Sequence, residues 1–589
     1  MTFLTCPKLR NQTSKMKKRI ACCSLSAFLS VCSYGQSGNN QREIDLGEIK
    51  GNVSMAYQQY QEDSAINAAV PDEKSTLTAF TNILYTRGNV SAGIRYESYL
   101  PAQLGYPDRF EGTGLGYRFA AYSTEKIGVT VGNFYEQFGS GLVFRCYEER
   151  LLGIDNAMDG MRVKAHPLPG LYVKGIYGKQ RFQFSDGLVN GSGLVRGIDG
   201  ELVLNELLDS LSNKSIDSLP YRKLNVILGG SFVSKYQSDN SPSLILPENV
   251  GTYAGRLRMN YGKVSVNGEY AYKINDPSGD NGFVYKDGHA ALLNFTYATK
   301  GFSLLLDAKT TDNFSFRSDR TAELQDLMIN FSPALTKQHS YNLAATLYPY
   351  GSRPWGEVAY QAELSYKVPK KSKIGGKYGM LLTANYATVF GLDSINILED
   401  ISAESSSREG YVNNSFFMPG KEKYFQDFNL EIKKKFSKTF RATYTYFSFF
   451  YNNDINQGAF DNNNKGVKGN IIAQIHVLDL SKRFMKKHNI RLELQHLSTQ
   501  QHLGNWATVL LEYTYSPHWF VGILDQYNYG NSDAEKQVHY LYGTVGYVKN
   551  AHRFTMGYGK QRAGLFCVGG VCRQVPASNG LTVTFTTSF

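Results

Sequence analysis

Apolar and polar residues alternate along most of this chain, in segments of about ten residues that follow one another from residue 49 to the end. The segment 89–100 reads NVSAGIRYESYL, in which Val, Ala, Ile and Tyr take every second position and Ser, Gly, Arg and Glu lie between them. The segment 507–515, ATVLLEYTY, repeats the pattern, and Arg491, Glu493 and Gln495 alternate with two leucines. A period of two residues predicts β-strands with one apolar and one polar face.

The connections between these segments alternate in length. Short ones recur at 87–89, 124–126, 166–170, 262–263, 299–301, 436–438, 516–517 and 549–551, and longer polar or aromatic ones lie between them at 101–114, 137–156, 312–321, 392–421 and 452–464. A soluble β-sandwich has no reason to keep this parity. The alternation is typical of a transmembrane antiparallel up-and-down β-barrel, with short periplasmic turns and long extracellular loops.

Counting by this parity predicts an all-β barrel of about 26 strands, within the range 24–26, and an even number. The segment 204–221 breaks the rhythm and predicts a longer periplasmic turn with a short helix. Residues 49–589 are expected to form a single outer-membrane β-barrel, preceded by a short lead at 36–48 that is too small for a plug or a binding module.

The first 35 residues have the pattern of a signal peptide. Met16-Lys17-Lys18-Arg19 is a basic start, residues 20–31 are apolar, and Ser33-Tyr34-Gly35 places small residues at a cleavage site. Residues 1–15 are expected to be an overhang upstream of the true start. The mature protein is therefore expected in the outer membrane of a Gram-negative bacterium, after export through the inner membrane.

Removing the signal peptide halves the net charge. The chain has 63 Lys and Arg against 51 Asp and Glu, and residues 1–35 hold six of the basic residues and no acidic ones, so the balance falls from +12 to 57 − 51 = +6. The remaining charge gives no support for a nucleic-acid partner. The composition, with 41 Tyr and 34 Phe but no mature apolar run of roughly 18 residues, suits strands that face lipid on one side and water on the other.

No catalytic constellation is visible. The ten histidines include no H-E-x-x-H pair, and the chain has no G-x-S-x-G, no Walker A motif and no Cys/His zinc cluster. We therefore expect no enzyme activity, no catalytic residue, no cofactor and no metal, with a barrel-embedded enzyme as a remote alternative.

The densest charged feature is a loop at 137–162, expected to fold into the lumen after the release at Gly139-Ser140-Gly141. One interpretation is a pore constriction, in which opposed charges create a transverse field that selects solutes. The other is that the charges pair with each other and brace the wall. Cys146 is expected to be a small buried side chain. The constriction candidates are Arg145, Glu148, Glu149, Arg150, Asp155, Asp159 and Arg162.

Aromatic residues fall into two groups. Those at one strand end predict an interfacial girdle, or alternatively a sugar-stacking platform in the lumen: Tyr444, Tyr446, Phe449, Phe450 and Tyr451. Those on the outer loops predict a docking surface for a partner, or alternatively a lid over the mouth: Tyr99, Tyr106, Phe110, Tyr411, Phe416 and Phe417.

The C-terminal region predicts a loop and a closing strand. Cys567 and Cys572 flank Gly569-Gly570 and are expected to form a small disulfide ring, with two free thiols as the alternative. Residues 579–589 then form the last strand, with Leu581, Val583, Phe585, Thr587 and Phe589 facing lipid. Phe585 and the terminal Phe589 are the expected assembly signal for the barrel-assembly machinery.

Two stretches of the sequence resemble a known group of proteins. VGNFYEQFGSGLVFR…GIDNAMDGMRV and GYGKQRAGLFCVGGVCRQVPASNGLTVTFTTSF are similar to an uncharacterised family of large outer-membrane barrels from Bacteroidota, over most of the mature chain. The first stretch also resembles, over a few residues, the G…FG…R…DG.R element of carbohydrate-exporting and porin-like barrels. The resemblance implies an outer-membrane location and no particular activity.

Three functions remain open from the sequence. The first is a porin-like channel for a solute or polymer, and the second is a non-conducting partner or scaffold barrel of an outer-membrane assembly or secretion machine, with its lumen blocked by its own loops. The third is the enzyme. The expected partners are outer-membrane lipid, the barrel-assembly machinery and, for the second function, an outer-membrane protein.

Overall fold

The computed structural model describes residues 46–211, 224–323, 325–396, 410–413, 415–458, 468–568 and 571–589. Glu48–Phe589 form one compact unit, which is the barrel. The expected signal peptide, and the lead up to residue 45, lie outside the described residues. No helix in the described ranges is long and apolar enough to cross a membrane.

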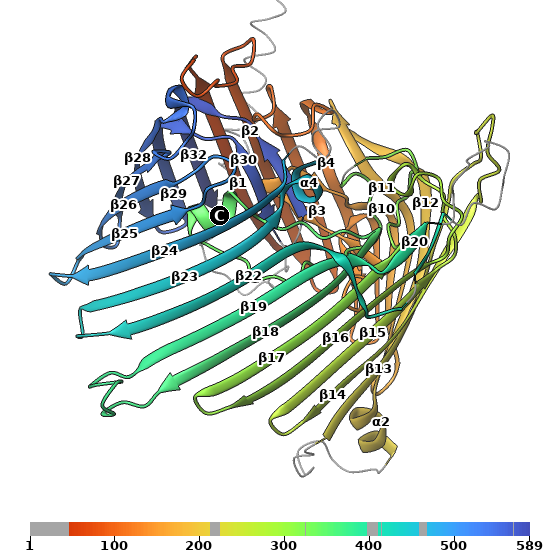
Figure 1. The fold of residues 1–589 in the computed structure, drawn as a ribbon. Coiled ribbons are helices and arrows are strands. Elements are labelled where there is room, and N and C mark those ends of the chain that lie inside the picture. Colours follow the sequence, from red (N-terminus) through yellow and green to blue (C-terminus); the bar gives the residue numbers. More distant parts are fainter. Residues whose placement is uncertain are drawn as a thin grey trace, which may run out of the picture. The chain divides into compact units, whose positions relative to one another are not determined.

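The barrel is a single antiparallel sheet of 24 strands, within the predicted range, in which each strand pairs with the next along the chain (Figure 1). The first twelve are β1 (Glu48–Tyr60), β2 (Ser75–Arg87), β3 (Val90–Tyr99), β4 (Phe110–Ser123), β5 (Ile127–Phe134), β10 (Met158–Leu168), β11 (Leu171–Ser185), β12 (Leu188–Val203), β13 (Leu224–Tyr236), β14 (Asn249–Tyr261), β15 (Val264–Lys273) and β16 (Gly288–Thr299). The other twelve are β17 (Phe302–Asp312), β18 (Gly356–Val368), β19 (Met380–Leu392), β22 (Pro419–Lys435), β23 (Phe440–Asn452), β24 (Asn470–Arg483), β25 (His488–Ser498), β26 (Trp506–Tyr515), β27 (Trp519–Tyr527), β28 (His539–Lys549), β29 (His552–Gln561) and β32 (Ser578–Ser588). The predicted all-β up-and-down barrel is confirmed.

The last strand closes the sheet on the first. β32 pairs with β1 from Gly580 opposite Tyr60 to Ser588 opposite Asn52. The terminal residue completes the ladder, because the Phe589 N–H donates to the Gly51 carbonyl and the Gly51 N–H donates to the Phe589 carbonyl, both at 2.9 Å. The Phe589 ring lies over Gly51, where a Cβ would overlap it.

Connections at the two ends differ as predicted. At one end, called the short-turn end, most strands are joined by a few residues, and the longest connection holds α2 (Leu204–Leu211). This confirms the predicted helix for the residues up to 211, and 212–223 lie outside the described part. The other end, called the long-loop end, holds β6 (Glu136–Phe138), β7 (Phe144–Cys146), β8 (Glu148–Glu149), η1 (Arg150–Leu152), β9 (Ile154–Asp155), η3 (Gly279–Asn281), α3 (Asn342–Thr346), β20 (Ser394–Asn396), β21 (Tyr411–Asn413), α4 (Asn453–Gly458), η4 (Ala534–Lys536), β30 (Gly564–Val568) and β31 (Val571–Val575).

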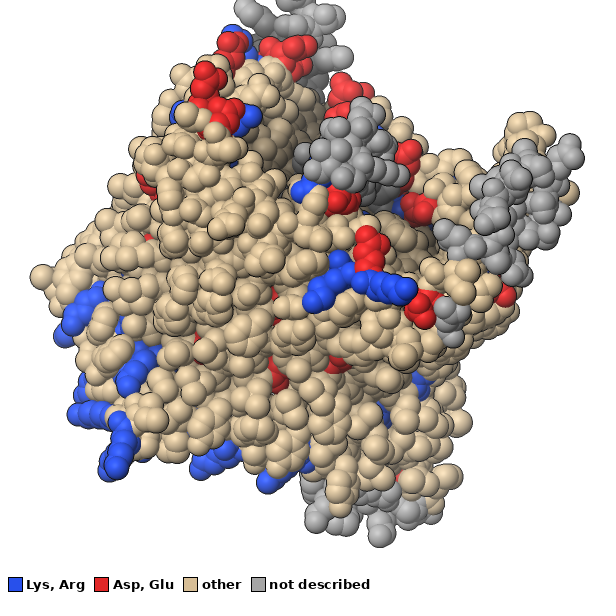
Figure 2. All heavy atoms as spheres, in the orientation of Figure 1, with Lys and Arg blue, Asp and Glu red and all other residues tan. Residues whose placement is uncertain are grey.

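Side chains alternate between the outside of the barrel and its lumen. On β3, Ile94 and Tyr96 are nearly half exposed on the outer surface, whereas Arg95 and Glu97 face the lumen and are buried. In the view of Figure 2, the charged residues gather mostly near the ends of the strands and leave a broad band of other residues between them. An apolar exterior with a polar interior is the arrangement of a transmembrane barrel.

The alternation corrects the predicted aromatic girdle. Tyr444 faces outward and hydrogen-bonds His476 of the neighbouring strand at 2.8 Å. Phe449 and Tyr451 instead face the lumen and are fully buried. The prediction was wrong for these two residues because odd and even positions of β23 lie on opposite faces of the sheet.

Several of the aromatic residues predicted to dock a partner are instead in contact with other residues of the barrel. Tyr99 and Phe110 are buried in a cluster with Phe80 and Phe184, against which Tyr106 packs. Tyr411 donates a hydrogen bond to Asp312 at 2.7 Å, and the Phe416 ring meets those of Tyr270 and His289. Tyr99 and Phe110 are therefore core residues of the wall, and a docking role for them is wrong.

Replacing Gly51 by valine should disturb barrel closure, because the new side chain would occupy the place of the Phe589 ring. We expect a smaller folded fraction after refolding, measured by the mobility difference between heated and unheated samples on a gel. Gly200→Val on β12 is the matched control, since nothing lies within 4 Å of a Cβ there. Equal folding of both variants would contradict a role for this contact.

Candidate functional site

Two segments of the long-loop end fold into the lumen. The first inward segment, residues 135–157, joins β5 to β10, and the second inward segment, residues 313–323 and 325–355, belongs to the connection from β17 to β18. Phe138, Leu142 and Phe144 of the first are fully buried in one cluster with Phe314 and Ile329 of the second. The same cluster includes lumen-facing residues of β11 to β16, so both segments pack against the inner wall.

The second inward segment continues along the other side of the lumen. Leu343, Tyr348 and Tyr350 are buried in a cluster with lumen-facing residues of β18 to β26, among them Phe447 and Trp506. The sequence predicted only the first segment. The second also carries charges close together, between Arg317 and Asp326, but no pattern in the sequence placed them in the lumen. Its partners are far along the chain: the Leu343 N–H donates to Gln495, 152 residues away.

Buried lysines tie the second inward segment to the wall. Lys273 on β15 donates to the Ser315 carbonyl at 2.8 Å, and Lys309 on β17 donates to the Pro333 carbonyl and pairs with Glu357. The side chains of Lys309 and Glu357 are completely buried. Because an unpaired buried charge is very costly, these contacts fix the segment in place.

Toward the short-turn end the lumen-facing positions are polar. Asn267, Asn294 and Asp307, on three consecutive strands, form a hydrogen-bonded row, and Gln361 donates to Asn385 at 2.7 Å. Arg256 pairs with Asp199 and Glu201 at 2.7 and 3.0 Å. Packed apolar clusters near one end thus give way to a hydrophilic wall near the other.

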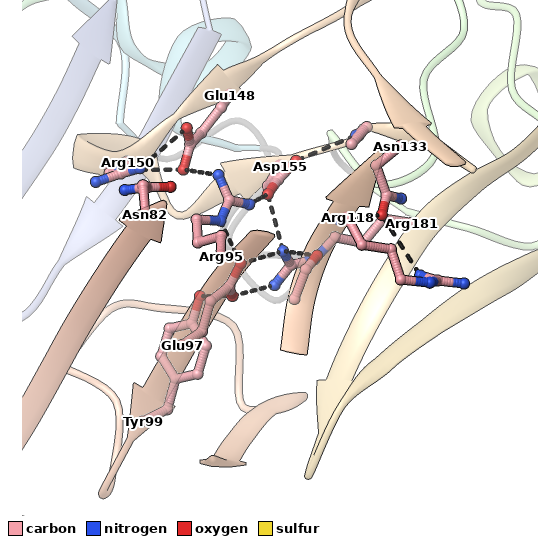
Figure 3. Close-up of polar contacts among 12 residues, drawn as sticks. Asn82, Arg95, Glu97, Tyr99, Arg118, Asn133, Glu148, Arg150, Asp155 and Arg181 are labelled. Carbon is pink, nitrogen blue, oxygen red and sulfur yellow. Dashed lines mark hydrogen bonds and ion pairs between the residues drawn. The ribbon is translucent and has the colours of Figure 1, made fainter. Parts of the chain in front are cut away.

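A charged cluster attaches the first inward segment to the wall (Figure 3). Arg181 of β11 contacts Glu97 of β3 at 2.7 Å and Asp155 at 2.9 Å. Arg95 contacts Glu97 at 2.6 Å and also pairs with Asp155. The two arginines and Glu97 are almost completely shielded from solvent. Alternation had placed Arg95 and Glu97 on a polar face, but nothing local pointed to Arg181, which lies 84 residues beyond Glu97.

Four predicted constriction residues are also held by neighbours. Glu148 contacts Arg95 at 3.1 Å and Arg150 at 2.7 Å. Arg150 lies over the Phe80 ring, and Arg145 lies 4.0 Å from the Phe331 ring centroid. Glu149 is half-buried in the short pairing of β8 with β9. These contacts agree with the bracing interpretation for Glu148, Arg150 and Asp155.

The remaining two candidates lie on β10, on opposite faces. Arg162 faces the lumen and donates to the Thr130 hydroxyl and the Tyr135 carbonyl, both at 3.0 Å. Asp159 shares the outer face with Met161 and pairs with Arg118 at 3.3 Å. The predicted place of Asp159 in the lumen is therefore wrong, because the two-residue period turns it outward.

The charged cluster also completes the barrel wall. β5 ends at Phe134 and β10 begins at Met158, whereas β4 and β11 on either side extend further, and they meet in a short parallel pairing of Phe110 with Phe184. Arg181 donates to the Gly116 carbonyl at 3.3 Å, and Arg109 donates to the Phe182 carbonyl at 2.9 Å. Side chains therefore satisfy strand carbonyls where the ladder is interrupted.

The predicted disulfide lies in a third hairpin, formed by β30 and β31. Cys567 and Cys572 are directly opposite each other in the antiparallel pairing, a position at which Cα atoms lie about 4.5–5.5 Å apart. That spacing suits a disulfide. The side chains of both cysteines, and Gly569 and Gly570, lie outside the described part, so the bond stays a prediction.

Cys146 is a free, buried thiol of the first inward segment. Burial raises the pKa of this thiol to about 12, so it stays protonated at neutral pH. In the described ranges, no group of three or more His, Cys, Asp and Glu side chains is arranged to hold a metal ion.

Residues 16–589 match the family of unknown function DUF6029. The chain belongs to this family. No curated protein matches the chain.

Several solved barrels are similar at low identity. The siderophore receptor PirA from Pseudomonas aeruginosa is 10% identical, with 92% of this chain and 80% of that chain covered and a TM-score of 0.39. The outer membrane protein opdK from Pseudomonas aeruginosa is 11% identical, with coverages of 77% and 99% and a TM-score of 0.33. OccAB3 from Acinetobacter baumannii is 10% identical, with coverages of 93% and 100% and a TM-score of 0.33. At these identities, what those proteins transport does not carry over to this member of DUF6029.

Arg181→Met should lower the free energy of unfolding by about 3–5 kcal/mol, because it leaves the buried carboxylates of Glu97 and Asp155 with one cation fewer. Urea unfolding in detergent micelles measures the change. Arg118→Met on the outer face is the control, and we expect a loss below about 1 kcal/mol there. Similar losses in both variants would show that burial of the cluster contributes little.

The disulfide is tested by alkylating the denatured mature protein with N-ethylmaleimide. We expect one label without reductant, on Cys146, and three labels after reduction, by mass spectrometry. Cys567→Ser with Cys572→Ser should leave one label in both conditions. Three labels on the unreduced wild type would establish free thiols.

Proposed function

We propose that this DUF6029 member is an outer-membrane channel whose lumen is constricted by its own inward segments. Barrels of 16 to 18 strands leave an aqueous channel, and barrels of 22 strands hold a plug in the lumen. A closed barrel of 24 strands has room for both water and folded segments. The outer-membrane location is supported by the apolar exterior, the alternating loop lengths and the expected signal peptide.

The orientation follows from the lengths of the connections and from the end at which β1 begins and β32 ends. Glu48 and Phe589 lie at the short-turn end, which in outer-membrane barrels faces the periplasm. The inward segments then enter from the extracellular side. The polar wall of the short-turn half opens toward the periplasm.

One observation carries the proposal, namely the unequal composition of the lumen along its axis. The half near the short turns has hydrogen-bonded Asn, Gln and Asp side chains on its wall, as in a water-filled pore. A barrel that served only as a scaffold would gain nothing from such a wall. The other half is narrowed by segments that the wall holds through paired charges.

The alternative of a non-conducting partner barrel is supported by the packing of the inward segments. Wall residues such as Val233 and Trp506 are buried against them, and Lys309 and Glu357 are fully desolvated. Packing of this density obstructs part of the lumen. The same feature suits a barrel that holds a partner and conducts nothing.

Single-channel recording in planar bilayers tests both functions. We expect small, stable conductance steps from the wild type, and larger steps when residues 335–350 are replaced by a short Gly-Ser linker, because this removes α3 from the lumen. A Gly-Ser replacement of residues 239–245, between β13 and β14, is the control and should leave conductance unchanged. Heat-dependent gel mobility checks that each variant is folded.

If the wild type and the linker variant are both silent, the channel proposal fails. A silent wild type that elutes with a stoichiometric outer-membrane protein would support the partner barrel instead.

A further inference from the structure

A cavity hollows the inner wall near the short-turn end, below the first inward segment. Its volume is about 490 Å³, within the usual range for small-molecule sites. The wall is recessed there because small residues face the lumen on neighbouring strands, including Ser91 on β3, Ala121 on β4 and Gly128 on β5. None of these residues was singled out by the sequence.

Positive charge exceeds negative charge at one side of this cavity. Arg162 and Lys164 of the lining contact Glu136 of the first inward segment at 3.5 and 2.8 Å, and Lys174, which like Glu136 lies outside the lining, contacts it at 3.2 Å. Three cations against one carboxylate leave two positive charges. The other charged residues of the lining, Glu125 and Lys126, offset each other.

Other lumen-facing arginines are surrounded by more carboxylates than cations. Arg256 faces two carboxylates, and Arg491 faces three, those of Asp479, Glu493 and Glu512. The excess at Glu136 is thus not a general property of this wall. The Lys164 side chain remains 42% exposed, although its ammonium group pairs with Glu136.

Glu136 itself stays ionised. Burial favours its neutral form, but the hydrogen bond from Lys164 and the charges of Lys174 and Lys164 outweigh this and lower its pKa. The carboxylate therefore neutralises one of the three cations under ordinary conditions, and the other two positive charges persist.

Part of the cavity lining is aromatic. Tyr117 and Phe119 of β4 line it together with Phe134 and Tyr135. The Tyr117 and Tyr135 rings are stacked, with centroids 5.4 Å apart. A flat or apolar group placed here would meet ring faces.

We infer that this cavity binds an organic anion, with its carboxylate or phosphate group on Lys164 and Arg162 and its apolar or aromatic body against Tyr117 and Phe119. Charge-assisted hydrogen bonds to the head would supply the affinity, and the aromatic wall would select for the body. The inference rests on the proposed function, because it names the class of solute that the channel takes.

Binding is measured on the purified full-length mature protein in detergent by isothermal titration calorimetry. The probes are phenyl phosphate and benzoate, which carry both a head and a body, inorganic phosphate, which has no body, and benzyl alcohol, which has no charge. We expect saturable binding of at least one of the first two and much weaker binding of the others. Whichever of phenyl phosphate and benzoate binds more tightly shows whether the site prefers a phosphate or a carboxylate group.

Three variants locate the site. Lys164→Gln with Arg162→Gln should weaken binding about tenfold or more, since charge-assisted contacts are lost. Ala121→Phe should also weaken binding, by filling the recess with no change of charge. Arg256→Gln, at the arginine that faces two carboxylates and does not line this cavity, should leave affinity within about twofold of wild type. Gel mobility confirms folding of each.

The inference is overturned if neither organic anion binds, if benzyl alcohol binds equally well, or if the Lys164 and Arg162 changes weaken binding no more than Arg256→Gln. Its failure is distinct from that of the proposed function. A barrel that conducts nothing but binds phenyl phosphate would contradict the channel and support the anion site. A barrel that conducts but binds no organic anion would support the channel and contradict the site.

Discussion

Complete pairing of backbone N–H and C=O groups is the constraint on which the rest of this structure depends, because hydrocarbon offers them no other partner. The reciprocal hydrogen bonds of Gly51 and Phe589 satisfy it at the closing edge. At the long-loop end β5 and β10 stop before their neighbours β4 and β11, and there Arg181 and Arg109 donate to strand carbonyls instead. The first role of the charged cluster is therefore to complete the hydrogen bonding of the barrel wall.

This role couples the wall to the first inward segment. The segment leaves the barrel at Phe134, which shortens the hairpin, and it carries Asp155 and Glu148 into the lumen, where they meet Arg95 and Arg181. Glu97 of the wall is one carboxylate against two buried arginines, and the two carboxylates of the segment supply the remaining negative charge. The first inward segment therefore interrupts the sheet and also supplies the carboxylates that hold Arg181 in place, where it donates to a strand carbonyl.

The sequence predicted the features that depend on local backbone geometry and missed those that depend on contacts between residues far apart in the chain. Strand existence, the inward position of Arg95 and the length of the connections follow from a two-residue period that the backbone imposes. The same period, applied residue by residue, would have turned Asp159 outward and Tyr451 inward. The second inward segment and the pairing of Glu97 with Arg181 were missed because their partners lie tens to more than a hundred residues away.

The two inward segments are attached to the wall by different contacts, and a bound solute would affect the first segment more than the second. Displacing the second segment would take the Pro333 carbonyl from Lys309 and the Arg353 N–H from Glu357, and would expose Tyr348, all of which are costly. The first segment is attached near the cavity through Glu136, whose carboxylate shares three cations. An arriving anion would compete with Glu136 for Lys164 and Arg162. Anion binding and the attachment of the first segment to the wall therefore depend on the same side chains.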